Sequence, residues 1–308
     1  VRQMGPFDEQ VNLRSTEFVL KVNTTPPLYL PRPYPFTLPN EVSFALEGTE
    51  AISRPIKKDN TFPVSTKEQN STIVKFNIAF NVDDKTKLEV KRSVNASGHN
   101  KDYHQYLVVT DYDYLKEYDQ QKYLVAKSSL FRGLVKDYNQ EKTKFEQRKV
   151  QDYNDRDKRV KGAIENDTEI KVAEYKKLTL KSIGMWDHSA NTEYEDELTI
   201  ESLSKKAGPN FIVDIGKLIE QQTEIKYEKR TRTRDIYMNY ARSFTNEISI
   251  AIPEGYSIEG LENFNKKAIT KTGGFESTAT SDGKTVTIKA NKYYNNNYYP
   301  VAEWPELL

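Results

Sequence analysis

The chain has 308 residues, in which 46 Lys and Arg nearly balance 45 Asp and Glu. This balance gives no overall field that would attract nucleic acid or an anionic membrane, and no apolar run approaches the roughly 20 residues of a membrane span. The absence of cysteine excludes disulfides, thiolate metal sites and a cysteine nucleophile within the chain. Because 20 Tyr and 13 Phe offset a charged fraction of 30%, we expect a folded core that is partly aromatic.

Residues 1–65 form a first unit that is irregular and rich in proline. Short strands are predicted at 16–22 and 42–52, and the proline run at 24–35 must be extended or looped because proline lacks an N–H donor. The chain starts at Val1 rather than at methionine, so we expect a fragment of a longer protein whose export signal, if any, lies upstream.

A β-hairpin is predicted over 73–95, because apolar residues alternate with polar ones on both sides of a polar turn. Residues 112–165 then change to a helical insertion. An apolar stripe at helical spacing predicts a helix over 120–145, and its members are Leu124, Phe131, Leu134, Val135, Tyr138 and Phe145. The charged run 146–161 shows no continuous apolar face, so we expect it to be the most mobile ordered part of the chain.

Strands return after residue 168, with candidates at 169–182, 194–203, 210–215, 223–232, 235–241, 246–252, 269–280 and 284–291. Ile248, Ile250 and Ile252 share one strand face, and Pro253 ends that strand. We therefore predict a mainly β protein with a helical insertion (α+β). The simplest arrangement is an antiparallel β-sandwich with a long helical crossover over 66–308, including a terminal subdomain at 234–308.

Few residues form a pattern that is typical of catalysis or metal binding. His99 and His104, with Asp102 and Asp111 nearby, are too small a set for a metal site, and we predict no metal. In the acidic run 193–197, Tyr194, Asp196 and Leu198 share one face of a predicted strand. Glu193, Glu195 and Glu197 share the other face, and a solvated sheet face is the favoured interpretation of this cluster. No phosphate loop, serine elbow or cofactor motif is present, so we predict no cofactor and no catalytic residue in this chain.

Two segments are candidates for a ligand-facing surface. Tyr293, Tyr294, Tyr298 and Tyr299 flank three asparagines and would suit a sugar or peptide, although such rings also cover the open end of a sandwich. Arg230 and Arg232 lie in a basic run that could hold an anion, but pairing with carboxylates of a neighbouring strand is the favoured interpretation. We expect no nucleic-acid partner, because no stacking platform alternates with this run. Glycosylation sequons begin at Asn23, Asn70, Asn95 and Asn166.

The C-terminal third carries a resemblance to a known family. The segments RDIYMNY (234–240), NEISIAIPEGY (246–256), SDGKTVTI (281–288) and YYPVAEWPELL (298–308) resemble the terminal domain of unknown function of transglutaminase-like proteins from Bacteroidetes. Upstream, YPFTLPNEVSFALEG (34–48) is similar to the segment that follows their catalytic core. The resemblance implies an exported protein, periplasmic or at the cell surface, in which a papain-like Cys-His-Asp core precedes a β-rich C-terminal part.

This chain departs from the family pattern where the chemistry would reside. It has no cysteine, and the segment 11–22, which sits where a catalytic histidine strand would be expected, carries no histidine. No catalytic residue can therefore be carried over. The upstream core of the same protein is the implied partner, and 1–65 is expected to be the end of a degenerate transglutaminase-like core.

Three functional hypotheses follow from these observations. The first is a non-catalytic scaffold or module that binds protein or glycan. The second is an accessory domain that shapes the substrate cleft of an active cysteine protease or transglutaminase whose core lies outside this chain. The third, a hydrolase based on paired carboxylates, has no distinguishing feature in the sequence. A cysteine at a helix start upstream would favour the second hypothesis over the first.

The alternation around Ile250 gives a direct test of the strand assignment. Ile250→Ala should lower the free energy of unfolding by about 2–5 kcal/mol, because a buried isoleucine would leave a cavity. Denaturant melts measure this loss, and a value below about 1 kcal/mol would show that the strand is exposed.

Overall fold

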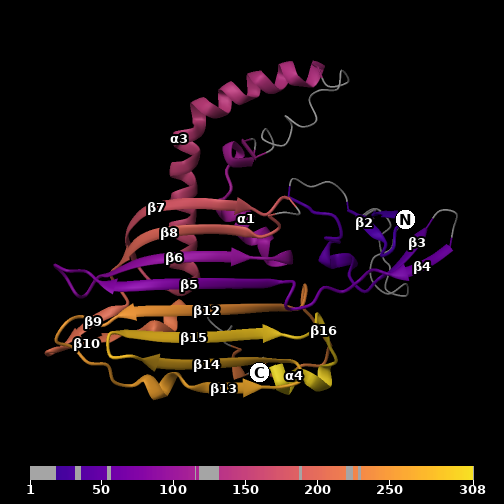
Figure 1. Cartoon of the computed structure of the whole chain (residues 1–308). Coiled ribbons are helices and arrows are strands. Elements are labelled where there is room, and N and C mark those ends of the chain that lie inside the picture. The colour runs from indigo at the N-terminus through magenta and orange to yellow at the C-terminus, as the bar shows by residue number, and fades with distance from the viewer. Residues whose placement is uncertain are drawn as a thin grey trace.

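The computed structural model describes residues 19–31, 36–53, 57–114, 116–117, 132–186, 189–219, 225–227 and 230–307. Its centre is one mixed sheet of eight strands in the order β13–β14–β15–β12–β5–β6–β8–β7 (Figure 1). The strands are β5 (Ser71–Phe80), β6 (Leu88–Ala96), β7 (Val172–Ile183), β8 (Thr192–Ile200), β12 (Arg242–Ala251), β13 (Lys266–Ile269), β14 (Gly273–Ser281) and β15 (Thr285–Tyr294).

Four short strand pairs surround this sheet: β1 (Leu20–Val22) with β2 (Leu28–Leu30), β3 (Glu50–Ser53) with β4 (Lys57–Thr61), β9 (Ser204–Ala207) with β10 (Asn210–Val213), and β11 (Ile236–Tyr237) with β16 (Tyr298–Tyr299). The α-helices are α1 (Lys101–Val108), α3 (Arg132–Thr168) and α4 (Trp304–Leu307). Single turns of 3-10 helix are η3 (Phe44–Leu46), η4 (Gly98–Asn100), η6 (Ile215–Leu218), η8 (Leu261–Phe264) and η9 (Val301–Glu303). Among the described residues, no helix is long and apolar enough to span a membrane.

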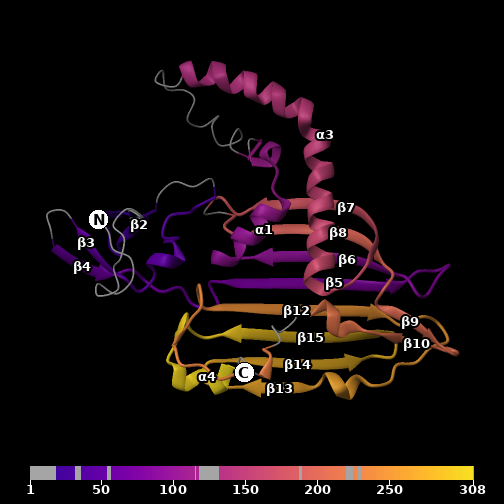
Figure 2. The same ribbon diagram turned by 180° about the vertical axis from the view of Figure 1, so that it is seen from behind.

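The predicted fold class, mainly β with a helical insertion, is confirmed. The arrangement differs from the expected antiparallel sandwich, because the long strands lie in a single sheet and one neighbouring pair, β5 with β12, is parallel. Figure 2 shows α1, α3 and the β9–β10 hairpin lying over the same face of this sheet. The opposite face carries charged side chains in cross-strand pairs, such as Glu247 with Lys75 at 3.0 Å and with Lys289 at 3.3 Å. An ion-paired face of this kind favours water over a second sheet.

The parallel pair joins the two halves of the chain. β12 runs beside β5 from Ser243↔Ser71 to Ile250↔Ile78, and each of the two strands has an antiparallel neighbour on its other side. Ile248 and Ile250 are buried in the main core, which confirms the predicted inward face of this strand. The terminal subdomain expected at 234–308 thus shares one sheet and one core with the strands that precede it.

Asn70 fastens the start of this parallel pair. Its side chain is buried and donates to the Ala241 carbonyl (2.9 Å), while its Oδ1 accepts the backbone N–H of His99 (2.9 Å). Gly98 has φ +53°, and a Cβ there would lie 2.2 Å from Asn70 Oδ1, so glycine is required at this close approach. The sequon that begins at Asn70 is therefore closed to a glycan in the folded chain, since both ends of the amide are used inside the protein.

The helical insertion is confirmed, and its charged run has a buried stripe where none was expected, while the mobility expected of this run stays a prediction. α3 is one continuous helix through 146–161, and Val160 and Ile164 are buried against the sheet (Figure 2). One face of this helix is formed by residues at spacings of three and four, namely Tyr153, Arg156, Val160 and Ile164. Arg156 belongs to this face because its aliphatic stem is buried, although a sequence pattern counts arginine as polar. The stripe predicted over 124–145 falls on residues whose side chains lie outside the described part.

A polar cluster lies between α1 and the sheet. Arg92 and Asp196, which are cross-strand partners on the covered face, form a bidentate ion pair with Nε–Oδ1 at 3.0 Å and Nη2–Oδ2 at 2.5 Å. Tyr175 donates to Asp196 Oδ2 at 3.1 Å. The predicted grouping of Tyr194, Asp196 and Leu198 on one face is confirmed, and Arg92 compensates the buried carboxylate of Asp196 on this covered face. The other face of the strand is solvated, as predicted for the acidic cluster, since Glu195 and Glu197 are exposed.

His104 of α1 packs beside this cluster, with its Nδ1 3.1 Å from the Tyr194 hydroxyl. Burial, assisted by the Arg92 charge, lowers the pKa of His104 from 6.5 to about 4. The unfolded chain therefore binds more protons than the folded chain between these two values, so stability falls as the pH drops through this window.

The lowered pKa of His104 can be tested by stability measurements. His104→Gln removes the titrating group. Between pH 6.5 and pH 4 the free energy of unfolding of this variant should therefore fall less than that of the wild type, and the two falls should differ by up to about 3 kcal/mol. Denaturant melts across this range measure the difference. Parallel curves for the two proteins would contradict the buried neutral imidazole.

The shared sheet predicts that residues 234–308 do not fold alone. Without β5, the β12 edge and its apolar face are exposed, so the fragment should lack a cooperative thermal transition and should aggregate. Adding a peptide of residues 71–80 should partly restore strand content by circular dichroism, whereas a peptide with the same composition in scrambled order should not. If the fragment melts cooperatively near the melting temperature of the full chain, residues 234–308 do not depend on β5 for folding and the prediction is wrong.

Candidate ligand-binding cavity

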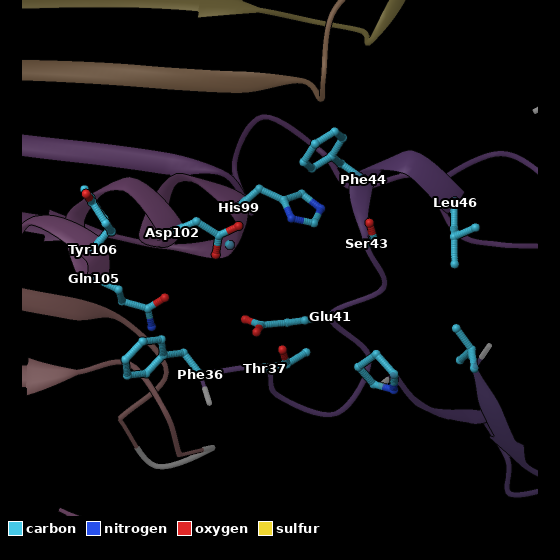
Figure 3. A pocket seen from close by; sticks show the side chains of 13 residues that line it. Phe36, Thr37, Glu41, Ser43, Phe44, Leu46, His99, Asp102, Gln105 and Tyr106 are labelled. Atoms are coloured by element: carbon cyan, nitrogen blue, oxygen red, sulfur yellow. The ribbon is translucent and has the colours of Figure 1, made fainter. Parts of the chain in front are cut away.

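A cavity of about 380 Å³ lies where the N-terminal segment meets η4 and α1 (Figure 3). One wall comes from the loop and 3-10 turn at 36–46, and the other from the residues that follow β6. The lining residues are Val19, Pro31, Phe36, Thr37, Glu41, Ser43, Phe44, Leu46, Gly98, His99, Asp102, Gln105 and Tyr106. Most of this surface is apolar or aromatic, with a few polar groups that converge on it, as in small-ligand sites.

The helical wall is positioned by its attachment to the sheet. His99, Asp102 and Tyr106 follow one another at spacings of three and four, so they lie on one side of the η4–α1 turn. Gln105 anchors the helix by donating to the Ile183 carbonyl at 2.8 Å, and Asn100 donates to the Asn70 carbonyl at 3.1 Å. This wall is therefore a fixed part of the main sheet.

Two polar contacts hold the N-terminal wall against it. Lys101 is 1% exposed, and its Nζ lies 2.5 Å from Glu41 Oε1 and 3.2 Å from the Gly184 carbonyl. His99 Nε2 lies 2.7 Å from Glu47 Oε1. A small core of Val19, Val42, Leu46 and Phe62, with Tyr29 packed against it, supports this wall from behind. The cavity thus lies between two elements that are joined at defined points.

The cavity region carries an excess of negative groups. Three carboxylates, Glu41, Glu47 and Asp102, face one ammonium, that of Lys101, and one imidazole. Asp102 makes no hydrogen bond or ion pair with any described residue. Its side chain is exposed to solvent, although desolvation by the neighbouring protein raises the pKa of its carboxyl. Glu47 Oε2 is buried and also has no hydrogen-bond partner within the described residues. A positive group in the cavity would offset this imbalance.

The histidines considered as a metal pair do not converge. His99 points to Glu47, whereas His104 points to Tyr194 on the covered face of the sheet. Asp111 lies in the segment after α1, where the neighbouring Asp113 accepts from Thr110 Oγ1 at 2.8 Å. In the described part of the chain, no group of three or more His, Asp or Glu side chains has a metal-binding arrangement.

The predicted tyrosine surface is divided by the structure. Tyr293 lies under the Lys67 ammonium (3.8 Å to the ring centre), and Tyr294 lies beside the Arg242 guanidinium (5.4 Å). Tyr298 is exposed, with its hydroxyl donating to Asp235 Oδ2 at 2.8 Å. Tyr299 is fully buried and donates to the Thr272 carbonyl at 2.7 Å, so its assignment to a ligand-facing surface is wrong.

The basic run also differs from its prediction. The described residues of 223–232 form no strand, and the strand predicted at 235–241 is reduced to β11. Arg230 and Arg232 are exposed and make no ion pair with any described carboxylate, so the favoured cross-strand pairing is wrong. Instead, Trp304 Nε1 donates to the Arg230 carbonyl at 2.5 Å, and the Arg232 guanidinium lies 4.8 Å from the Trp304 ring centre.

The cavity was missed by sequence reasoning because its two walls are distant in the chain and neither has a motif. His99 and Asp102 were noted only as incomplete metal ligands. The one usable signal was the run 34–48, in which apolar residues stand next to Glu41 and Glu47 directly after a proline-rich segment.

Comparison with known families bears on the C-terminal part of the chain alone. Residues 212–308 match a family described as a domain of unknown function with a solved structure, DUF3858. No curated protein and no solved structure gives a match. The matched residues contain β12 to β16 and α4, so they supply the half of the sheet that pairs with β5, while both walls of the cavity lie upstream of them. In its C-terminal third, the chain is thus similar to a family whose own function is undefined.

Proposed function

We propose that this chain is a non-catalytic binding module and that the cavity between the N-terminal segment and α1 is its ligand site. The observation that carries the proposal is the combination of a partly open, largely apolar hollow with a solvent-exposed carboxylate, Asp102, that has no partner among the described residues. Of the two ligand classes expected from sequence, protein or glycan, a protein segment fits this chemistry better, because the walls are aromatic and aliphatic rather than polar.

The ligand group that fits has an apolar body and a positively charged end. Phe36, Phe44 and Leu46 supply apolar contacts for the body, as the arrangement in Figure 3 suggests. Asp102 and the second carboxylate, Glu41, attract the charged end, and aromatic faces nearby also favour a cation. No lysine or arginine lines the cavity among the described residues, but the Lys101 ammonium behind the wall already pairs with Glu41, so Asp102 is the main carboxylate for the charged end.

The wider setting belongs to the same proposal. The sequence resemblance supports a module of an exported transglutaminase-like protein of Bacteroidetes, periplasmic or at the cell surface, with an upstream core as its partner. The match of residues 212–308 supports only the coarser assignment to a domain of unknown function. The accessory role beside an active cysteine protease or transglutaminase remains the alternative, and an upstream cysteine core in the full-length sequence would favour it.

Calorimetric titration tests the site. A blocked tripeptide with lysine in the middle should bind, while its norleucine and glutamate counterparts should bind more weakly or not at all. Asp102→Asn should weaken lysine-peptide binding about tenfold, since one charge-assisted contact of about 1–1.5 kcal/mol is removed. Phe44→Ala should weaken both the lysine and the norleucine peptides, because it removes apolar contact rather than charge.

Asp83→Asn is the matched control, since this exposed carboxylate lies in the turn between β5 and β6, away from the cavity. The affinity should also fall as the pH decreases through the raised pKa of Asp102, because protonation removes the charge, and this dependence should be smaller in Asp102→Asn. The groups that share the site with Asp102 are His99, Lys101 and Glu41, so the comparison is made between the two proteins at each pH. Equal affinities for the lysine and glutamate peptides would refute the site.

A further inference from the structure

A second surface, at the end of the sheet where β11 and β16 pair, carries three exposed arginines. Arg230, Arg232 and Arg234 are all exposed, and none has a carboxylate within ion-pair distance among the described residues. This differs from the strands of the open face, where Lys75, Lys91, Lys176, Lys181, Lys267 and Lys289 each pair with a carboxylate. Arg230 Nε donates to the Ile225 carbonyl at 3.2 Å, but no described carboxylate holds any of the three guanidinium groups, so their charges are available to a partner.

The backbone that carries these arginines is held in place. Trp304 is buried in a small core with Ile236 and Tyr299, and its Nε1 donates to the Arg230 carbonyl. Arg232 lies over the ring of the same tryptophan at 4.8 Å. Asp235 completes the attachment by accepting from the Val301 backbone N–H at 2.8 Å and from the Tyr298 hydroxyl at 2.8 Å. Asp235 stays ionised and Glu303 also lies near Tyr298, but neither carboxylate is within ion-pair distance of the three guanidinium groups.

Two exposed aromatic rings adjoin the arginines. Tyr237 and Tyr298 are cross-strand partners in the β11–β16 pair and are 68% and 41% exposed. Their ring centres are 5.0 Å apart at an interplanar angle of 52°, so each ring covers part of the other's face. Nucleic-acid bases and sugar rings need an open aromatic face for stacking, whereas a protein partner can contact ring edges and hydroxyls. The pair therefore favours a protein partner over a nucleic acid or a glycan.

We propose that this Arg–Tyr surface, formed by Arg230, Arg232, Arg234, Tyr237 and Tyr298, binds an acidic segment of a protein. Carboxylates of the segment would receive the planar, two-pronged donors of the guanidinium groups. Apolar side chains between those carboxylates would contact the tyrosine pair. Arginine and tyrosine are also the residue types that contribute most to protein interfaces. This surface is independent of the cavity, which selects the opposite charge.

The test uses the full chain and a fluorescently labelled peptide in which glutamate alternates with leucine. Fluorescence anisotropy should detect binding that weakens with added salt, because exposed charge pairs are screened. The variant Arg230→Gln, Arg232→Gln, Arg234→Gln should bind about tenfold more weakly, from three exposed contacts of about 0.5 kcal/mol each. Tyr237→Ala should weaken binding while leaving the salt dependence unchanged.

A matched control removes three positive charges elsewhere. Lys205, Lys206 and Lys284 are exposed at the opposite end of the sheet, and their joint replacement by glutamine should leave the affinity unchanged. Thermal melts establish that each variant is folded, and Asp102→Asn should bind the acidic peptide like the wild type. The proposal is overturned if the arginine and lysine triple variants lose equal affinity, if the glutamine version of the peptide binds equally well, or if single-stranded DNA or an acidic polysaccharide binds more tightly than the peptide.

Discussion

The parallel pairing of β5 with β12 is the interaction on which the rest of the structure depends. β12 is the last strand of the antiparallel set β13–β14–β15–β12, and β5 is the first strand of the antiparallel set β5–β6–β8–β7. Both sets contribute residues to one hydrophobic core, so neither has a complete apolar face without the other. The pairing places the residues after β6 next to those before β12, where Asn70 binds both and orients Gly98 and His99. One wall of the cavity is therefore a consequence of how the sheet is joined in the middle.

Charge is distributed differently over the parts of the molecule. On the open face of the sheet, opposite charges alternate across strands and neutralise one another. Under α1, one buried carboxylate is matched by one arginine. Near the cavity one carboxylate, and near the β11–β16 pair three guanidinium groups, have no ion-pair partner among the described residues. A nearly neutral chain can thus present two local fields of opposite sign, as the two proposed sites require.

Local pattern was sufficient to predict much of the fold and little of the site. Ile248 and Ile250 alternate with polar residues at a period of two, and this pattern was enough to predict both the strand and the burial of its isoleucine face. The parallel neighbour of that strand could not be predicted, because β5 shows the same alternation whichever strand it pairs with. The charged run of α3 misled for a related reason: Arg156 contributes a buried stem that is counted as polar in a sequence pattern. The cavity depends on the contact of 36–46 with α1 through Lys101, and a lysine gives no sequence sign that it is buried.

The parallel join also has a consequence for how the chain reaches its native state. A parallel pair cannot form through a tight turn, and here its two strands are separated by α1, α3 and the β7–β8 hairpin. During synthesis, β5 emerges early and pairs with β6, but its second edge stays open until β12 has been made. Closure of such a distant contact is slow compared with hairpin formation, and the open edge is prone to pair with other chains. Chaperone protection of the nascent chain between these two events is therefore expected to matter more for its yield than the stability of the finished sheet.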